Sequence, residues 1–94
     1  MLYMVYMKVN FPATLQKDEI DRLKVEAKAH SQKLQRDGKW RHLWRVAGQY
    51  ANFSVFEASG NDEIHEILMS VPIFPYTSIE VTPLAQHPSA ISLD

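Results

Sequence analysis

The 94-residue sequence contains no cysteine, which excludes a disulfide scaffold, a thiol nucleophile and a thiolate metal site. Only three glycines are present, and they are too scattered to form a glycine-rich phosphate loop. Ten basic residues stand against eleven acidic ones, whereas a nucleic-acid-binding domain normally shows a basic excess. We therefore expect no nucleic acid among the partners of this chain.

Long apolar runs are also missing, since no run approaches the roughly 20 residues that a membrane-spanning helix needs. The apolar residues 1–8 lack the basic region and the small-residue cleavage site of a signal peptide. The four histidines show no paired spacing of the kind that binds metal, and no Gly-x-Ser-x-Gly sequence marks a serine hydrolase. We expect a cytoplasmic protein with no membrane partner and no metal.

Hydrophobic periodicity predicts six elements in the order β-α-β-β-α-β. Strands are expected over residues 2–11, 39–47, 50–57 and 76–81, and helices over 15–37 and 62–70 with Asn61 as the N-cap of the second. This order is that of the α+β, ferredoxin-like split β-α-β fold with a four-stranded antiparallel sheet. The whole chain, 1–94, is expected to form one domain.

Two helices can cover only one face of such a sheet, while residues 50–57 carry large apolar side chains in both alternating sets. An exposed apolar sheet face is unfavourable on a monomer, and a chain of this length buries only a thin core. We therefore expect copies of the chain to pair through their sheets, as in a dimeric α/β-barrel.

The hexapeptide at 40–45, Trp-Arg-His-Leu-Trp-Arg, concentrates both tryptophans and one histidine in six residues. Strand alternation predicts two sets on opposite faces: Trp40, His42 and Trp44 on one, and Arg41, Leu43 and Arg45 on the other. Such a strand suits a small, anionic, partly apolar ligand, and His42 and Arg41 then cannot point to the same side. The alternative is structural, with the tryptophans as core or interface anchors and the arginines in ion pairs.

Other polar side chains have two interpretations as well. Lys24 flanks the apolar stripe of the long helix, where its ammonium can reach the rim of a pocket between helix and sheet or simply reach water. Glu26 lies further from that stripe, and it is either a base or a solvated surface acid. Asn52 can bind a carbonyl or a neighbouring backbone group, and His87 lies in a tail that can fold over its own pocket or a neighbour's.

Five stretches of the chain resemble the muconolactone Δ-isomerase family: residues 34–48, 50–56, 74–76, 87–88 and 1–3. The resemblance runs nearly end to end. It implies a ferredoxin-like subunit, dimers formed through sheet faces, a homodecamer, and a C-terminal tail, 83–94, that crosses onto a neighbouring subunit. It also implies a cofactor-free, metal-free enzyme of aromatic hydrocarbon catabolism in the bacterial β-ketoadipate pathway.

The implied reaction converts muconolactone into 3-oxoadipate enol-lactone by moving the double bond of the lactone ring. A base removes the γ proton to give a dienolate, and a proton returns at the α carbon. The candidate proton-transfer residues are His42 and Glu26. The candidate substrate-binding residues are Lys24, Arg41 and Arg45 for the carboxymethyl arm, Trp40, Trp44 and Phe74 for excluding water, and Asn52 and His87.

One position departs from the family pattern, because relatives carry an acid at or beside the inward helix position of Ala27. The nearest acid here is Glu26, on a less favourable helix face, and this favours His42 as the base. Two alternative functions stay open. One is dehalogenation of chloromuconolactone by the same proton abstraction, and the other is a non-catalytic module that binds a small ligand.

Overall fold

The computed structural model describes residues 1–91 of the chain. The elements follow one another as β1 (Leu2–Val9), α1 (Lys17–Arg36), β2 (Trp40–Arg45), β3 (Ala51–Glu57), α2 (Asn61–Ser70), the short 3₁₀ helix η1 (Phe74–Tyr76) and β4 (Thr77–Leu84). Every predicted helix and strand is present, with ends that differ from the expected ones by at most three residues. The predicted order of elements is therefore confirmed.

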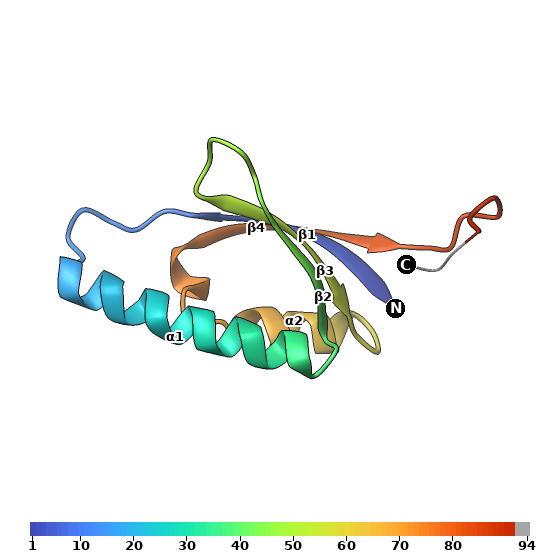
Figure 1. Cartoon of the computed structure of the whole chain (residues 1–94), viewed down its shortest axis with the longest axis horizontal. Coiled ribbons are helices and arrows are strands. Elements are labelled where there is room, and N and C mark those ends of the chain that lie inside the picture. The colour runs from blue at the N-terminus through green and yellow to red at the C-terminus, as the bar shows by residue number, and fades with distance from the viewer. Residues whose placement is uncertain (92–94) are drawn as a thin grey trace.

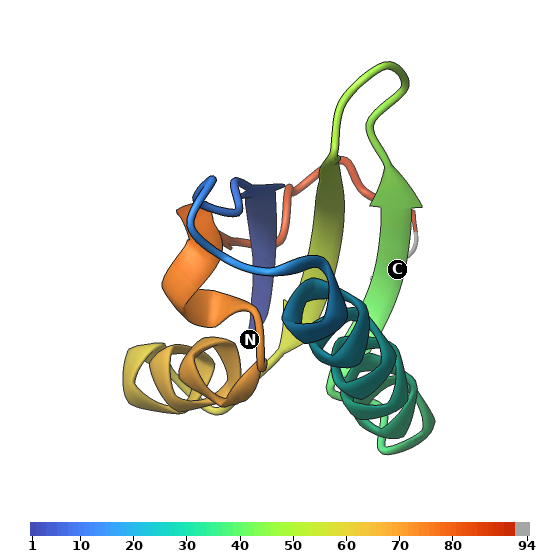
Figure 2. The same cartoon turned by 90° about the vertical axis from the view of Figure 1, so that its left-hand side faces the viewer.

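The four strands form one sheet in the order β2-β3-β1-β4, and each neighbouring pair is antiparallel. Both α-helices lie on the same side of this sheet, as the two views in Figures 1 and 2 show. The other side, which we call the open face, carries no α-helix within the described residues. These features confirm the α+β, ferredoxin-like fold with an antiparallel sheet.

The core lies between the sheet and the two helices. Alternate side chains of β1, beginning with Tyr3, Val5 and Met7, point toward the helices and are at most 1% exposed. Phe56 of β3 packs among them without exposure. The Tyr3 hydroxyl donates to Asn61 Oδ1 over 2.9 Å. Asn61 is the first residue of α2 and Gly60 precedes it as the cap, so the predicted N-cap role of Asn61 is wrong because its side chain serves Tyr3 instead.

β4 runs three residues further than the predicted strand. It pairs with the whole length of β1, from Val9↔Thr77 to Leu2↔Leu84, and includes Pro83. Proline is tolerated there because β4 is an edge strand of the sheet. The tail therefore begins after Leu84 rather than at Pro83, and in Figure 1 it extends beyond the end of the sheet. The last residues of the predicted tail, 92–94, lie outside the described part.

The open face is apolar, as the alternation in β3 predicts. Tyr6, Phe53 and Trp44 form a row across three strands, and the rings of Tyr6 and Phe53 lie 5.1 Å apart. Trp44 is 53% and Phe53 44% exposed. No helix within residues 1–91 is long and apolar enough to cross a membrane.

Candidate active site

A β-bulge in β2 decides where the side chains of the hexapeptide point. Trp40 pairs with Phe56 and His42 pairs with Val55. A step of two residues along β2 therefore corresponds to a step of one residue along β3. The extra residue is Arg41, and regular pairing resumes at His42. A bulge of this kind breaks the alternation of a strand and re-aims its side chains.

The predicted division of the hexapeptide is therefore wrong. Trp40 and Leu43 share the helix side with Arg45, while His42 and Trp44 share the open face. Arg41 lines the same cavity as His42, so the expectation that these two cannot point to one side is wrong as well. The physical reason is the bulge, because one inserted residue reverses the alternation between Trp40 and the rest of the strand.

Two cavities follow from this arrangement, one on each side of the sheet. The helix-side cleft lies between α1 and the sheet and has a volume of about 320 Å³. Its polar lining consists of Lys28, Ser31, Trp40, Arg45, Tyr50 and Asn52, and its apolar lining includes Met7, Ala27, Leu43, Val71 and Ile73. The open-face groove has a volume of about 880 Å³ and is bounded by β1, β2, β3 and the tail.

Tyr50, at the solvent-exposed edge of the helix-side cleft, is contacted by two cations. Lys24 Nζ lies 5.4 Å and Arg45 Cζ lies 5.2 Å from the centre of its ring. Cation–π contacts of this length are attractive and hold flexible side chains in place. Within residues 1–91 neither cation, nor Lys28, has a carboxylate oxygen within 4 Å. The cleft thus offers positive charge that no acid of the described chain neutralises.

The inner wall of the helix-side cleft carries hydrogen-bond donors. Trp40 is 4% exposed and its ring packs on Phe56, with the ring centres 4.7 Å apart. Its indole nitrogen is buried and has no hydrogen-bond partner among residues 1–91. Asn52 Oδ1 accepts a hydrogen bond of 2.7 Å from the buried Ser54 hydroxyl, so the Asn52 amide nitrogen is left to donate elsewhere.

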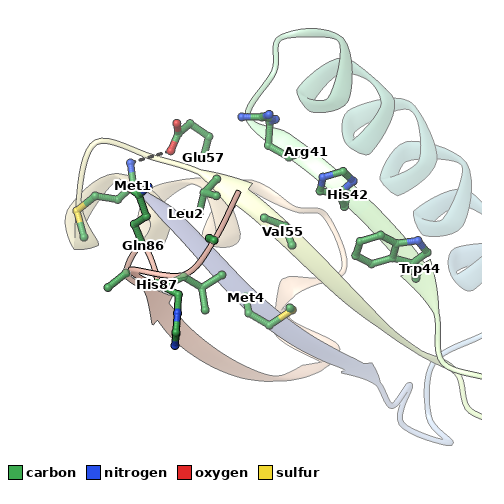
Figure 3. Close-up of a pocket in the computed structure, with 13 residues that line it drawn as sticks. Met1, Leu2, Met4, Arg41, His42, Trp44, Val55, Glu57, Gln86 and His87 are labelled. Carbon is green, nitrogen blue, oxygen red and sulfur yellow. Dashed lines mark hydrogen bonds and ion pairs between the residues drawn. The ribbon is translucent and has the colours of Figure 1, made fainter. Parts of the chain in front are cut away.

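The open-face groove contains different chemistry, as Figure 3 shows. His42 stacks on Trp44 with the rings nearly parallel, 6° apart, and their centres separated by 5.1 Å. Glu57 accepts a 2.7 Å hydrogen bond from the N-terminal ammonium. That bond, helped by the Arg41 guanidinium, keeps the pKa of Glu57 below its usual value although burial opposes the shift. His87 reaches this groove from the tail.

The comparisons with known proteins agree with each other. The family model described as "Muconolactone delta-isomerase" matches residues 1–90. The muconolactone Δ-isomerase of Acinetobacter baylyi is 47% identical over 94 residues, which cover 100% of this chain and 98% of that protein. That of Cupriavidus pinatubonensis is 50% identical over 91 residues, covering 97% and 99%.

The chain belongs to the muconolactone Δ-isomerase family. A crystal structure of muconolactone isomerase superimposes with a TM-score of 0.92 at 47% identity, covering 100% of this chain and 98% of that one. A 5-chloro-2-hydroxyhydroquinone dehydrochlorinase from Burkholderia phenoliruptrix gives a TM-score of 0.62 at 21% identity, covering 93% and 96%. The second likeness concerns the fold alone.

Membership of this family was predicted, but the predicted site residues do not all meet. Three of them line the helix-side cleft, namely Trp40, Arg45 and Asn52. A fourth, Lys24, contacts the Tyr50 ring at the edge of this cleft. Four others line the open-face groove, namely Arg41, His42, Trp44 and His87. Glu26 is exposed on α1, and Glu26 and Phe74 line neither cavity. His42 and Glu26, the two predicted proton-transfer residues, are thus on separate surfaces.

Two cleft residues were missed by the sequence interpretation. Lys28 lies one helical turn after Lys24, and this i, i+4 spacing was a usable signal. Tyr50 gave no signal, because its contact with Lys24 and Arg45 depends on how α1 crosses the sheet. Ala27, the position that departs from the family pattern, lines the helix-side cleft, and no carboxylate or imidazole of residues 1–91 does so.

Proposed function

We propose that this chain isomerises muconolactone in the helix-side cleft, as a step of aromatic hydrocarbon breakdown through the β-ketoadipate pathway. The activity follows from the family, to which the chain is similar over its whole length. The choice of cavity is carried by one observation, the combination of cations without acidic partners and a buried donor without an acceptor. A small anionic lactone supplies what both of these groups lack.

The carboxymethyl arm of the lactone is the anionic end, and Arg45 is its proposed partner. A guanidinium holds a carboxylate through two parallel hydrogen bonds, and the Tyr50 ring already restrains the position of Arg45. Lys24, on the same ring, adds positive charge at the entrance of the cleft. The lactone ring then rests against Trp40, Val71 and Ile73, where apolar contact excludes water.

Proton transfer needs a base inside the cleft, and we assign this role to Lys28. Lys28 is an exposed residue that lines the cleft, whereas Glu26 lines neither cavity and His42 lies across the sheet. In the proposed sequence the Lys28 amine takes the γ proton, and the electron pair of the broken C–H bond enters the dienolate. The resulting ammonium then gives a proton to the α carbon, which restores the amine and completes the 1,3 shift.

The open-face groove is the second candidate site, and a specific observation favours it. The bulge places Arg41 and His42 on the same side, so a carboxylate-binding group and an imidazole base lie next to each other. The flat contact with Trp44 also orients the imidazole ring of His42. In this alternative Arg41 holds the carboxymethyl arm and His42 moves the proton.

Two arginines of the same strand separate these sites, because Arg45 faces the helix side and Arg41 faces the open side. A charge-assisted hydrogen bond contributes about 1.5–3 kcal/mol, so losing it raises KM about 10- to 100-fold. We expect this rise for Arg45→Met and a KM near that of the unchanged protein for Arg41→Met, in a direct assay of muconolactone turnover. The reverse result assigns the reaction to the open-face groove.

The same preparations address the alternative functions. Incubation with plain and chlorinated muconolactone separates isomerisation from dehalogenation, since only the latter releases chloride. Turnover of the chlorinated lactone alone rejects the isomerase proposal. Tight binding of both lactones without any product supports a non-catalytic binding module instead.

We further propose a cytoplasmic homo-oligomer built from dimers, of ten subunits as the family resemblance suggests, in which the open faces pair and the tail reaches a neighbouring subunit. The row of Tyr6, Phe53 and Trp44 supports pairing, because two of its large apolar side chains are half exposed on the single chain. Native mass spectrometry measures the subunit number directly, and a monomer at micromolar concentration contradicts the proposal.

A further inference from the structure

The indole N–H of Trp40 is a buried hydrogen-bond donor with no acceptor in the part of the chain that the structure describes. Almost all buried polar groups in proteins are paired, because an unpaired one loses its hydrogen bond to water and gains nothing in return. Trp40 is 4% exposed, so bulk water does not satisfy the nitrogen. The unpaired N–H group therefore costs stability, which the burial of the Trp40 ring has to offset.

The packing role of Trp40 does not require this nitrogen. Its ring contacts Phe56 face to face with a tilt of 33°, and a phenylalanine ring makes the same kind of contact. Trp40 also closes the inner wall of the helix-side cleft. An unpaired donor that costs stability, and that packing does not explain, is typical of a group whose acceptor arrives with a ligand.

A second donor lines the same cleft. The Ser54 hydroxyl donates to Asn52 Oδ1, and this bond turns the Asn52 amide so that its oxygen is engaged and its nitrogen is available. Ser54 is fully buried, so the orientation is held from inside the sheet. Trp40 and Asn52, each with an N–H group that has no acceptor in the described chain, both line this cleft, and no carboxylate of residues 1–91 lines it.

We propose that Trp40 is a catalytic residue whose indole N–H binds the lactone carbonyl oxygen, with the Asn52 amide as a second donor. This inference rests on the proposed function. When the γ C–H bond breaks, its electron pair moves through the ring and the negative charge collects on the carbonyl oxygen. A donor fixed beside that oxygen binds the dienolate more strongly than the neutral ester, and this difference lowers the barrier.

The test replaces the N–H group while keeping an aromatic ring. For Trp40→Phe we expect kcat to fall about 100- to 1,000-fold, as for the loss of one oxyanion donor, with KM changed less than about threefold. The smaller phenylalanine ring leaves a cavity in the core, so the melting temperature should fall, although removal of the unpaired donor offsets part of that loss. A kcat within threefold of the unchanged protein overturns the proposal.

Phe56→Leu is the matched control for packing, since Phe56 contacts the Trp40 ring but carries no polar group. A merely structural role of Trp40 predicts that both variants lose melting temperature and activity together. The proposal predicts that both variants lose stability but that kcat falls for Trp40→Phe and is retained for Phe56→Leu. Parallel losses of kcat in both variants overturn it.

A binding measurement keeps the proposal testable if Trp40→Phe does not fold. The sequence has two tryptophans, so ¹⁵N-labelled protein shows two indole signals, and Trp44→Phe identifies which one belongs to Trp40. Tetronic acid, a hydroxybutenolide that is anionic at neutral pH, serves as the dienolate mimic. We expect a downfield shift of the Trp40 indole proton on titration, and its absence at saturation overturns the proposal.

The proposed function and the proposed role of the Trp40 donor are rejected by different results. If the protein does not turn over muconolactone, the proposed function fails, while the indole shift with tetronic acid still tests the donor. If turnover is normal, Arg45→Met raises KM and Trp40→Phe keeps its kcat, the site is right and the donor is wrong.

Discussion

The assignment of Lys28 as the base predicts a loss of activity that a neighbouring residue can restore. Lys28→Met keeps the aliphatic stem that lines the helix-side cleft and removes the amine. Ala27 lines the same cleft and carries no functional group, so Ala27→Glu places a carboxylate where the cleft has none. We expect Lys28→Met to be nearly inactive and the double variant Ala27→Glu/Lys28→Met to recover part of the lost rate.

The size of both changes follows from general acid–base catalysis, which contributes about 10²- to 10⁴-fold to a proton-transfer step. Lys28→Met should lose a factor in this range from kcat. The recovered part should be smaller, because a carboxylate also repels the carboxymethyl arm and thereby raises KM. Since the helix position of Ala27 is only partly exposed, its new carboxylate is expected to act within the cleft rather than in solvent.

The assay is steady-state turnover of muconolactone between pH 4 and 9, followed by the ultraviolet absorbance of the lactone. Because the base is a different chemical group, the double variant should show a pH–rate profile that differs from that of the unchanged protein. Ala29→Glu, on the exposed side of α1, is the matched control and should restore nothing in the Lys28→Met background. Full activity of Lys28→Met, or equal recovery from Ala29→Glu, refutes the assignment, and a loss confined to His42→Ala moves the base to the open-face groove.

Two further predictions concern stability and assembly. Because the hydrogen bond from the N-terminal ammonium lowers the folded pKa of Glu57, its stabilising effect is present above the ordinary carboxyl value of 4.5 and is lost as pH falls through the folded pKa. Glu57→Gln should therefore lower the unfolding free energy at pH 7 but have little effect at pH 2, as urea titrations at both values measure; equal effects contradict the reasoning. Trp44→Glu places a charge in the apolar row of the open face and should reduce the mass measured by native mass spectrometry, whereas an unchanged mass argues against pairing through this face.

The element order was predictable because its signals are local. The apolar residues on the inner side of α1 recur at helical spacing, and every second residue of β1 is apolar and buried, so neither pattern needs long-range information. Ends of elements that depend on a partner strand were less predictable. β4 continues through Pro83 because β1 offers pairing as far as Leu2, and nothing within residues 76–84 reports the length of β1.

The site was predictable in its residues but not in their grouping. Trp40, Arg45 and Asn52 were recognised as binding residues, and the structure gathers them in the helix-side cleft. Their separation from His42 was not recognised, because it depends on one hydrogen-bonding register. A bulge has no sequence signal in this strand, since its extra residue is an arginine rather than a glycine.

The bulge at Arg41 lets one short strand serve two surfaces with different requirements. In a regular strand Trp40, His42 and Trp44 lie on the same face. If Trp40 is then buried in the core, His42 and Trp44 must face the core as well. With one inserted residue, Trp40 enters the core while His42 and Trp44 stay on the open face. The two tryptophans, each followed by an arginine in the sequence, thereby acquire unlike roles, one beside the helix-side cleft and one on the open face. The hexapeptide is consequently not one site but the boundary between two, and substitutions on its alternate sides should separate turnover from assembly.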